Sequence, residues 1–232
     1  MLPPAMAATT LLPTRPRIAA SLERAPIIAV VRTRSREEAG RQARLFAAAG
    51  LELIEITFTV PGAAGLVREL LAERSRQSPD AAPPWFGMGT VTTAARAQEA
   101  LAAGAEFFVT PNTNPEVARI ARESGTYLAM GAMTPTEIVA ARELGADLVK
   151  VYPIPLVGGP SYLSVIRQPL DDIPMMASGG YGLEEIPAYG KAGATAFGIG
   201  APLLGPSEDE TRQRIAHALD LARQNRTRQE ER

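Results

Sequence analysis

The 232-residue sequence contains no cysteine and only one histidine, His217. Without cysteine there can be no disulfide, no thiolate nucleophile and no sulfur ligand for a metal. His217 lies beside charged residues in a late helical pattern, Arg212 to Gln224, whereas a general base needs a pocket. We therefore interpret His217 as a solvent-exposed helix residue, and we expect neither histidine chemistry nor a histidine-rich metal site.

Strong net charge and long apolar runs are also missing. A net charge of −1 and a pI near 6.0 do not indicate a basic nucleic-acid surface or a polybasic membrane patch. No apolar run approaches the roughly 18 to 20 residues of a membrane span, and residues 1–17 do not have the pattern of a secretory signal. We expect a cytoplasmic protein with a small-molecule partner, a disordered tail over 1–17 and a frayed, charged tail over 224–232.

Lysine is the scarce basic residue. The chain has only Lys150 and Lys191, and the other 22 of its 24 basic residues are arginine. Lys150 stands between Val149 and Val151, where a cation is costly to bury. Because lysine can form a Schiff base and arginine cannot, Lys150 is the first candidate for chemistry.

Apolar runs of strand length alternate eight times with helical patterns. The expected strands run over residues 26–31, 51–57, 85–89, 106–110, 127–131, 147–152, 174–177 and 194–198. Ser35 and Thr134 each precede a glutamate by three residues, which is the spacing of a capping box, and Asn114 precedes Pro115 at a helix start. Eight such units in one domain, 18–223, predict an α/β fold, a (β/α)8 TIM barrel with a short helix before the first strand.

The active site of such a barrel lies at the C-terminal ends of its strands. The polar and glycine residues expected there are Arg32, Glu55, Thr57, Thr90, Thr110, Lys150, Ser178, Gly179, Gly180, Gly198 and Gly200. Side chains from alternate strands share a layer, so Glu55 of the second strand and Lys150 of the sixth can meet in the barrel mouth. This pair could be a buried ion pair that only fills the barrel, but the scarcity of lysine favours a functional role.

Two opposing effects act on the pKa of Lys150, and the sequence does not show which one is larger. Burial in an apolar mouth lowers the pKa of an amine and makes it more nucleophilic, whereas a nearby glutamate favours the ammonium form.

The loops after the seventh and eighth strands carry Ser178-Gly-Gly180 and Gly198-Ile-Gly200. Glycine-rich loops at these two strand ends are either tight turns or a cradle for a phosphate group.

Six motifs, in this order along the chain, resemble the family of 2-keto-3-deoxy-6-phosphogluconate (KDPG) and 4-hydroxy-2-oxoglutarate (KHG) aldolases. They are Ile28-Ala-Val-Val-Arg32, Leu53-Ile-Glu-Ile-Thr57, Gly87-Met-Gly-Thr-Val91, Val109-Thr-Pro-Asn112, Val149-Lys-Val-Tyr-Pro153 and Ser178-Gly-Gly180. Each motif is short, but together they are specific and span roughly residues 26–204.

The resemblance implies a class I aldolase that needs no metal or other cofactor and is usually a homotrimer. Such an enzyme cleaves a 2-keto-4-hydroxy acid to pyruvate and an aldehyde, as in Entner-Doudoroff carbohydrate metabolism. By this resemblance Lys150 is the Schiff-base lysine, Glu55 the general acid and base, and Thr90 a contact for the substrate carboxylate.

The resemblance also assigns the rest of the site. Arg32 and the backbone at Gly179 and Gly180 would hold the distal, often phosphorylated, end of the substrate. Pro111 would shape the pocket wall, and Tyr152 would pack beside the lysine.

Two positions depart from the family pattern. Thr59 stands where many 6-phosphogluconate-type members carry an arginine for the substrate carboxylate, and Ala201 stands where members often carry a phosphate-contacting serine. The 6-phosphogalactonate (KDPGal) type also lacks that arginine and carries the Thr-Pro-Asn found here at Thr110 to Asn112.

The leading hypothesis is therefore a pyruvate-yielding aldolase, with oxaloacetate decarboxylation as a side activity because loss of carbon dioxide leaves the same enamine. One rival is a phosphosugar isomerase or synthase barrel in which Glu55 is the base and Lys150 only an electrophile. Another is a barrel that senses a keto acid without turnover, since barrels host many functions.

Overall fold

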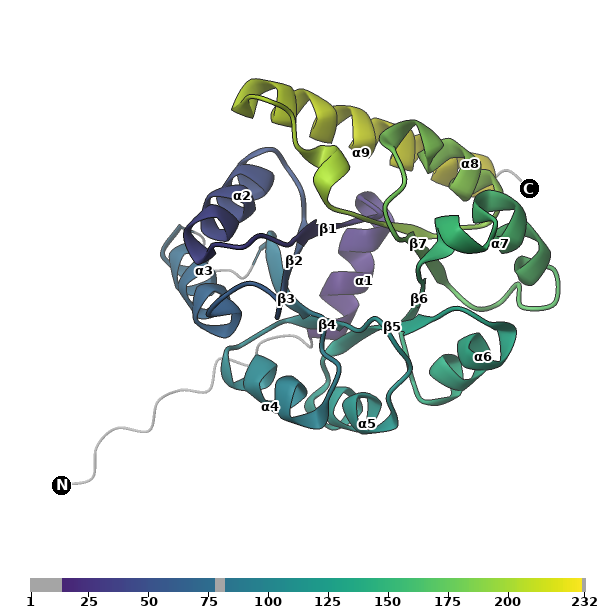
Figure 1. Ribbon diagram of the computed structural model, residues 1–232, viewed down its shortest axis with the longest axis horizontal. Coiled ribbons are helices and arrows are strands. Elements are labelled where there is room, and N and C mark those ends of the chain that lie inside the picture. The colour runs from purple at the N-terminus through teal and green to yellow at the C-terminus, as the bar shows by residue number, and fades with distance from the viewer. Residues whose placement is uncertain (1–13, 78–81, 231–232) are drawn as a thin grey trace.

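Eight parallel strands close into a barrel in the computed structural model, which describes residues 14–77 and 82–230 (Figure 1). The strands are β1(Ile27–Val31), β2(Leu53–Thr57), β3(Trp85–Gly89), β4(Phe107–Val109), β5(Tyr127–Ala132), β6(Leu148–Val151), β7(Met175–Ser178) and β8(Ala196–Ile199). Each strand pairs with the next one in the sequence, and β8 pairs with β1. The TIM barrel predicted from the sequence is confirmed.

Helices surround the barrel and connect its strands (Figure 1). They are α2(Arg36–Ala48), α3(Ala63–Gln77), α4(Ala94–Ala102), α5(Pro115–Ser124), α6(Pro135–Glu143), α7(Gly159–Arg167), α8(Ile186–Lys191) and α9(Glu208–Glu230). Short 3-10 turns, η1(Ile154–Val157), η2(Leu183–Glu185) and η3(Ala201–Leu203), lie in the last three connections. The side chains of Ser35, Asn114 and Thr134 cap their helices as predicted, and the reciprocal capping box forms at Thr134.

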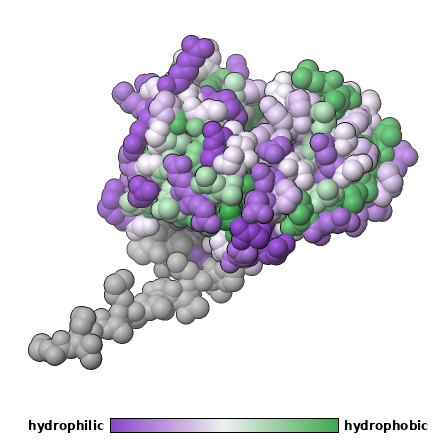
Figure 2. All heavy atoms as spheres, turned by 60° about the horizontal axis from the view of Figure 1, so that its bottom comes forward, coloured by the Kyte–Doolittle hydropathy of each residue, from purple (hydrophilic) through white to green (hydrophobic). Residues whose placement is uncertain are grey.

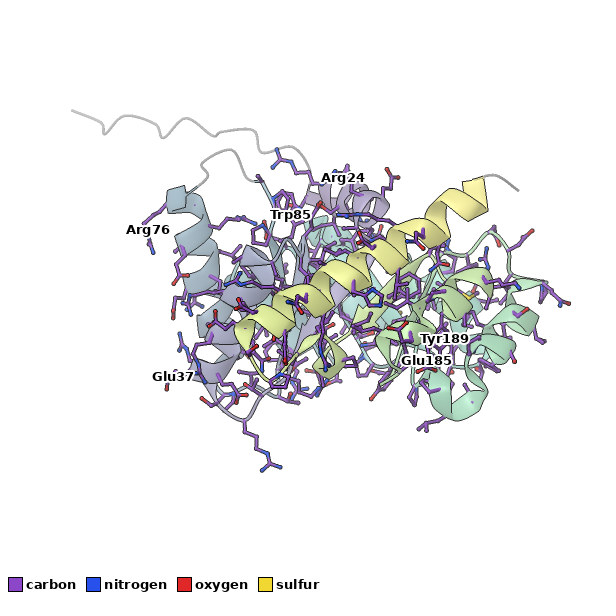
Figure 3. The ribbon with its side chains drawn as sticks, turned by 90° about the horizontal axis from the view of Figure 1, so that it is seen from above. Arg24, Glu37, Arg76, Trp85, Glu185 and Tyr189 are labelled. Carbon is purple, nitrogen blue, oxygen red and sulfur yellow. The ribbon has the colours of Figure 1, made fainter. Side chains whose placement is uncertain are left out.

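An additional helix, α1(Thr14–Arg24), lies across one end of the barrel (Figure 1). Its buried Ile18 and Leu22 pack against residues at or near the strand starts, among them Trp85, whose indole N–H donates to Ser21 Oγ at 2.8 Å. In the side view of Figure 3, Trp85 and Arg24 lie at this end and Glu37, at the start of α2, at the other. Because α1 closes the N-terminal end, the barrel can open only at its C-terminal end.

Parts of both predicted tails are helical. Helix α1 begins at Thr14, inside the segment predicted to be disordered, because Arg15 forms an ion pair with Asp147 at 3.0 Å. Residues 1–13 lie outside the described residues. At the other end α9 continues to Glu230 through the segment predicted to fray. Asn225 supports this extension, since it is buried and its side chain donates to the carbonyl oxygens of Ile186 and Leu221.

The core consists of two groups of buried side chains. One fills the N-terminal end of the barrel around Phe107 and Met176, and the other lies between the strands and the surrounding helices. The strands are almost wholly buried, in agreement with their continuous apolar sequences. On the face seen in Figure 2, polar and apolar residues are interspersed. Among the described residues no helix has the length and apolarity of a membrane span.

Candidate active site

Glu55 on β2 is a fully buried carboxylate at the C-terminal end of the barrel, with 1% of its surface exposed. Neither carboxylate oxygen has a hydrogen-bond partner. Burial raises the pKa of Glu55 above its ordinary value, and the charges of Lys150 and then Arg32 oppose that rise. A buried carboxyl with a raised pKa is suited to accept a proton and return it.

The space for the Glu55 carboxylate is provided by Gly89 at the end of β3. A Cβ atom placed on Gly89 would lie 1.7 Å from Glu55 Oε1, far inside van der Waals contact. Gly89 pairs with Thr57 across the two strands, two residues beyond the pairing of Glu55 with Gly87. Any side chain at position 89 would therefore have to displace the carboxylate.

Lys150 on β6 is buried with 7% of its surface exposed. Burial lowers the pKa of Lys150 below its ordinary value, while Glu55 raises it and Arg32 lowers it further. Glu55 is the charge that acts most strongly on Lys150, and Lys150 is the charge that acts most strongly on Glu55. The amine also lies 5.1 Å from the ring centroid of Tyr152.

The loop after β4 closes over the strand next to Lys150. Gly131 of β5 pairs with Lys150, and a Cβ on Gly131 would lie 2.2 Å from the carbonyl carbon of Pro111. Thr110 fixes this approach, because its hydroxyl donates to the Asn112 carbonyl and accepts from the Gly131 amide. Pro111 thus packs on the strand beside the lysine, and Thr110 is a structural residue of the loop.

A chain of hydroxyl groups follows Arg32 across the ends of β1, β2 and β3. The Arg32 guanidinium donates to Thr59 Oγ1 at 3.2 Å and to Thr90 Oγ1 at 3.4 Å. Thr59 shares a 2.8 Å hydrogen bond with the buried Thr57, which donates to the Val31 carbonyl at 3.2 Å. Arg32 itself is exposed and forms no ion pair within the described part of the chain.

Thr90 has an unusual backbone. Its φ of 61° is the only positive value at a non-glycine residue among those described, and this region is unfavourable for a β-branched side chain. Arg96 of α4 supports the conformation, since its Nη1 donates to the Thr90 carbonyl at 3.1 Å and to Thr92 Oγ1 at 2.9 Å. Such strain, held in place by a half-buried neighbour, is typical of binding sites.

The C-terminal end of the barrel contains a cavity of about 340 Å³. Eight residues predicted from the sequence line it, namely Arg32, Lys150, Tyr152, Ser178, Gly179, Gly180, Gly198 and Gly200. Glu55, Thr90 and Pro111 do not line it. Glu55 is buried and interacts electrostatically with Lys150. Thr90 accepts a hydrogen bond from Arg32, and Pro111 packs on Gly131.

Part of this lining was not predicted from the sequence, above all Gln42, which belongs to α2 rather than to a strand end. Strand-end positions alone could not have identified it.

Gly179 has a φ of 134°, and a Cβ there would lie 2.9 Å from Pro153 Cα, so this loop requires glycine. His217 is exposed on α9, as predicted, and its Nε2 lies 2.8 Å from Glu184 Oε1.

The geometry agrees with the similarities of the chain to known proteins. A family model described as KDPG and KHG aldolase matches residues 18–218. A 2-dehydro-3-deoxy-phosphogluconate aldolase of Treponema pallidum is 33% identical over 73% of this chain and 77% of that protein. A probable 2-dehydro-3-deoxy-6-phosphogalactonate aldolase of Rhizobium meliloti is 32% identical over 84% and 90%.

Two solved structures show the same fold at higher coverage. One, described as native KDPGal, has a TM-score of 0.77 and 27% identity over 87% of this chain and 96% of its own. The other, a 4-hydroxy-2-oxoglutarate and 2-dehydro-3-deoxyphosphogluconate aldolase from TTHB1, has a TM-score of 0.75 and 27% identity over 88% and 97%.

Proposed function

Because the chain belongs to the KDPG and KHG aldolase family, we propose that Lys150 is the Schiff-base lysine of an aldolase and Glu55 its acid and base. The enzyme is a carbon–carbon lyase that cleaves a 2-keto-4-hydroxy acid to pyruvate and an aldehyde. The observation that carries the assignment of residues is the buried Lys150 and Glu55 pair at the C-terminal end of the barrel.

The reaction begins at the amine of Lys150. A neutral amine, favoured by burial, attacks the C2 carbonyl carbon of the substrate, and loss of water leaves an iminium. Glu55 takes the proton of the C4 hydroxyl through an ordered water, the C3–C4 bond breaks, and its electrons pass to the iminium nitrogen. The products of this step are the aldehyde and an enamine on Lys150.

The second half regenerates the enzyme. Glu55, now protonated, returns its proton to C3 of the enamine, and water hydrolyses the resulting iminium to pyruvate and the free lysine. The raised pKa of Glu55 supports this double role, because a carboxyl with a raised pKa is a stronger base and holds the proton it must return.

The proposal is tested by pyruvate release from KDPG, KDPGal and 4-hydroxy-2-oxoglutarate with EDTA present. We expect turnover of at least one substrate, its loss in Lys150→Met, and a fall of about 10²- to 10⁴-fold in Glu55→Gln. The matched control is Lys191→Met, which removes the exposed second lysine on α8 and should keep parental activity. Release that persists in Lys150→Met would exclude this mechanism.

Oxaloacetate should be decarboxylated at the same site. Condensation with Lys150 gives an iminium β to the departing carboxylate, and loss of carbon dioxide leaves the pyruvyl enamine formed in aldol cleavage. We expect this activity to vanish in Lys150→Ala. If that variant decarboxylates oxaloacetate at the parental rate, the activity does not depend on a Schiff base at Lys150.

We also propose that the enzyme assembles as a homotrimer. Leu156 on η1 and Val165 on α7 are large apolar side chains with 81% and 65% of their surface exposed, which supports burial against another subunit. Light scattering should give three times the mass of the chain, and Leu156→Glu should lower it. A monomer in the parental protein would contradict the proposal.

A further inference from the structure

We propose that Arg32 binds the carboxylate of the 2-keto acid, next to the reacting carbon, and not the distal end of the substrate. This inference rests on the proposed Schiff-base function and names the residue that recognises the acid group. It differs from the role that family resemblance implies for this position. The observations that carry it are the hydrogen bonds of the guanidinium and its electrostatic reach.

The direction of the Arg32 side chain is the first observation. Strand β1 lies between β8 and β2, so a side chain at its end can turn toward the glycine loops or toward β2 and β3. Arg32 turns toward β2 and β3, where it donates to Thr59 and Thr90. The hydroxyl chain through Thr57 to the Val31 carbonyl anchors that side of the mouth.

The position of the acceptors is the second observation. Thr90 directly follows Gly89, whose backbone lies against the Glu55 carboxylate, so the guanidinium is held on the Glu55 side of the mouth. Its charge also lowers the pKa of both Glu55 and Lys150. Arg32 is therefore close enough to the two reacting groups to interact with both of them.

Substrate geometry links these observations. The carboxylate of a 2-keto acid is bonded directly to the carbon that Lys150 attacks, so it must bind within a few ångströms of the amine. The guanidinium has no acidic ion-pair partner among the described residues and can offer two parallel N–H donors to a carboxylate. Thr59 and Thr90 hold the guanidinium in place, and the Thr90 hydroxyl, which accepts from Arg32, can donate its own proton to the same group.

This arrangement gives a role to Thr59. A threonine at that position cannot carry the positive charge that binds the acid, but it can accept a hydrogen bond from a guanidinium that reaches it from the neighbouring strand. The cation is thus supplied by β1, and β2 and β3 supply the hydroxyls that orient it.

Pyruvate and acetone separate the two ends of the substrate. Pyruvate carries the carboxylate and no distal group, and acetone is a ketone that carries neither. Each ketone is trapped on Lys150 with borohydride over a range of concentrations in the parent, Arg32→Gln, Arg32→Lys and Arg34→Gln, with mass spectrometry as the readout. Arg34 is an exposed arginine on the same loop and is the matched control.

We expect Arg32→Gln to need roughly 10- to 100-fold more pyruvate for half-maximal trapping, the size of a lost charged hydrogen-bonded contact. Arg32→Lys should recover part of this loss, and Arg34→Gln should match the parent. Removing the Arg32 charge also raises the pKa of Lys150 and so changes its reactivity toward any ketone. Acetone trapping measures this change by itself, because acetone has no carboxylate. The loss with pyruvate should exceed the change with acetone.

Equal changes for the two ketones would overturn the proposal, because Arg32 would then act only through Lys150. Unchanged pyruvate trapping with a raised KM for the complete substrate would also overturn it and assign Arg32 to the distal end. Failure of pyruvate to modify Lys150 in the parent is a different result, which removes the proposed Schiff-base function itself.

Discussion

The carboxylate of Glu55 lies directly against the backbone of Gly89, so closely that a Cβ on Gly89 would come within 1.7 Å of Glu55 Oε1. The buried acid of β2 therefore depends on the absence of a side chain on β3. Because the two residues come from neighbouring strands, the position of the acid is fixed by the barrel rather than by a loop.

Gly89→Ala should abolish most of the turnover by displacing Glu55. We expect a loss of stability of about 1 to 3 kcal/mol from overpacking. In Glu55→Ala the same substitution should cost much less, because the group it meets has been removed. Urea unfolding of the four proteins of this cycle measures the coupling, and additive losses would mean that the two side chains do not compete for space.

Thr90→Gly should make the protein more stable and the enzyme worse. Relief of the backbone strain at a φ of 61° outweighs the greater chain entropy of glycine, and we expect a net gain of roughly 1 kcal/mol. Loss of the hydroxyl that contacts Arg32 should raise KM for the keto acid. Thr90→Ala provides the comparison, since it removes the hydroxyl and keeps the strain. A less stable Thr90→Gly would show that the conformation is not strained.

The pH dependence of trapping should report the charges around Lys150. The rate rises as the amine loses its proton, and burial should place the midpoint below the ordinary lysine pKa of about 10.4. The charge of Glu55 raises the pKa of Lys150 and the charge of Arg32 lowers it. Glu55→Gln should therefore shift the midpoint to lower pH and Arg32→Gln to higher pH. Shifts in the opposite directions would contradict the arrangement of these charges.

Lys150→Met should destabilise the protein in a pH-dependent way. Without the amine, Glu55 loses its strongest opposing charge, and its folded pKa rises further above the unfolded value of about 4.3. The protonated carboxyl is then the form the folded state favours. The stability it contributes is complete below pH 4.3 or so and is lost as pH rises through the folded pKa.

The cost of Lys150→Met should accordingly reach about 3 to 5 kcal/mol at pH 8 and be smaller at pH 5. Glu55→Gln added to Lys150→Met should restore most of it, because no buried charge remains. Chemical unfolding at the two pH values measures both effects, and a cost that is the same at pH 5 and pH 8 would show that Glu55 is not the group responsible.

The barrel and the central pair could be predicted from the sequence for physical reasons. Eight apolar runs separated by helical patterns allow few folds, and a parallel barrel places strand ends on one face. Lys150 was identified because lysine is rare in this arginine-rich chain. Its position on the sixth strand then indicated Glu55, because side chains of the second and sixth strands can share a layer of the barrel. These signals are local in the sequence or follow from the fold class.

The remaining features depend on tertiary packing. The direction of the Arg32 side chain is set by hydroxyls on two other strands, and the conformation of Thr90 by Arg96. Gln42 reaches the cavity from a helix. The extension of α9 depends on Asn225 fitting against Gly190, since a Cβ there would lie 2.4 Å from the Asn225 amide carbon. No pattern of apolar residues encodes such contacts.

The most direct test of the central claim is borohydride reduction of the parental protein with pyruvate, followed by peptide mass mapping. If Lys150 is the Schiff-base lysine, one reduced pyruvyl group will be found on the peptide containing Lys150, with none on Lys191 and none in Lys150→Met. Pyruvyl modification that leaves Lys150 free, or its complete absence at saturating pyruvate, would contradict the account.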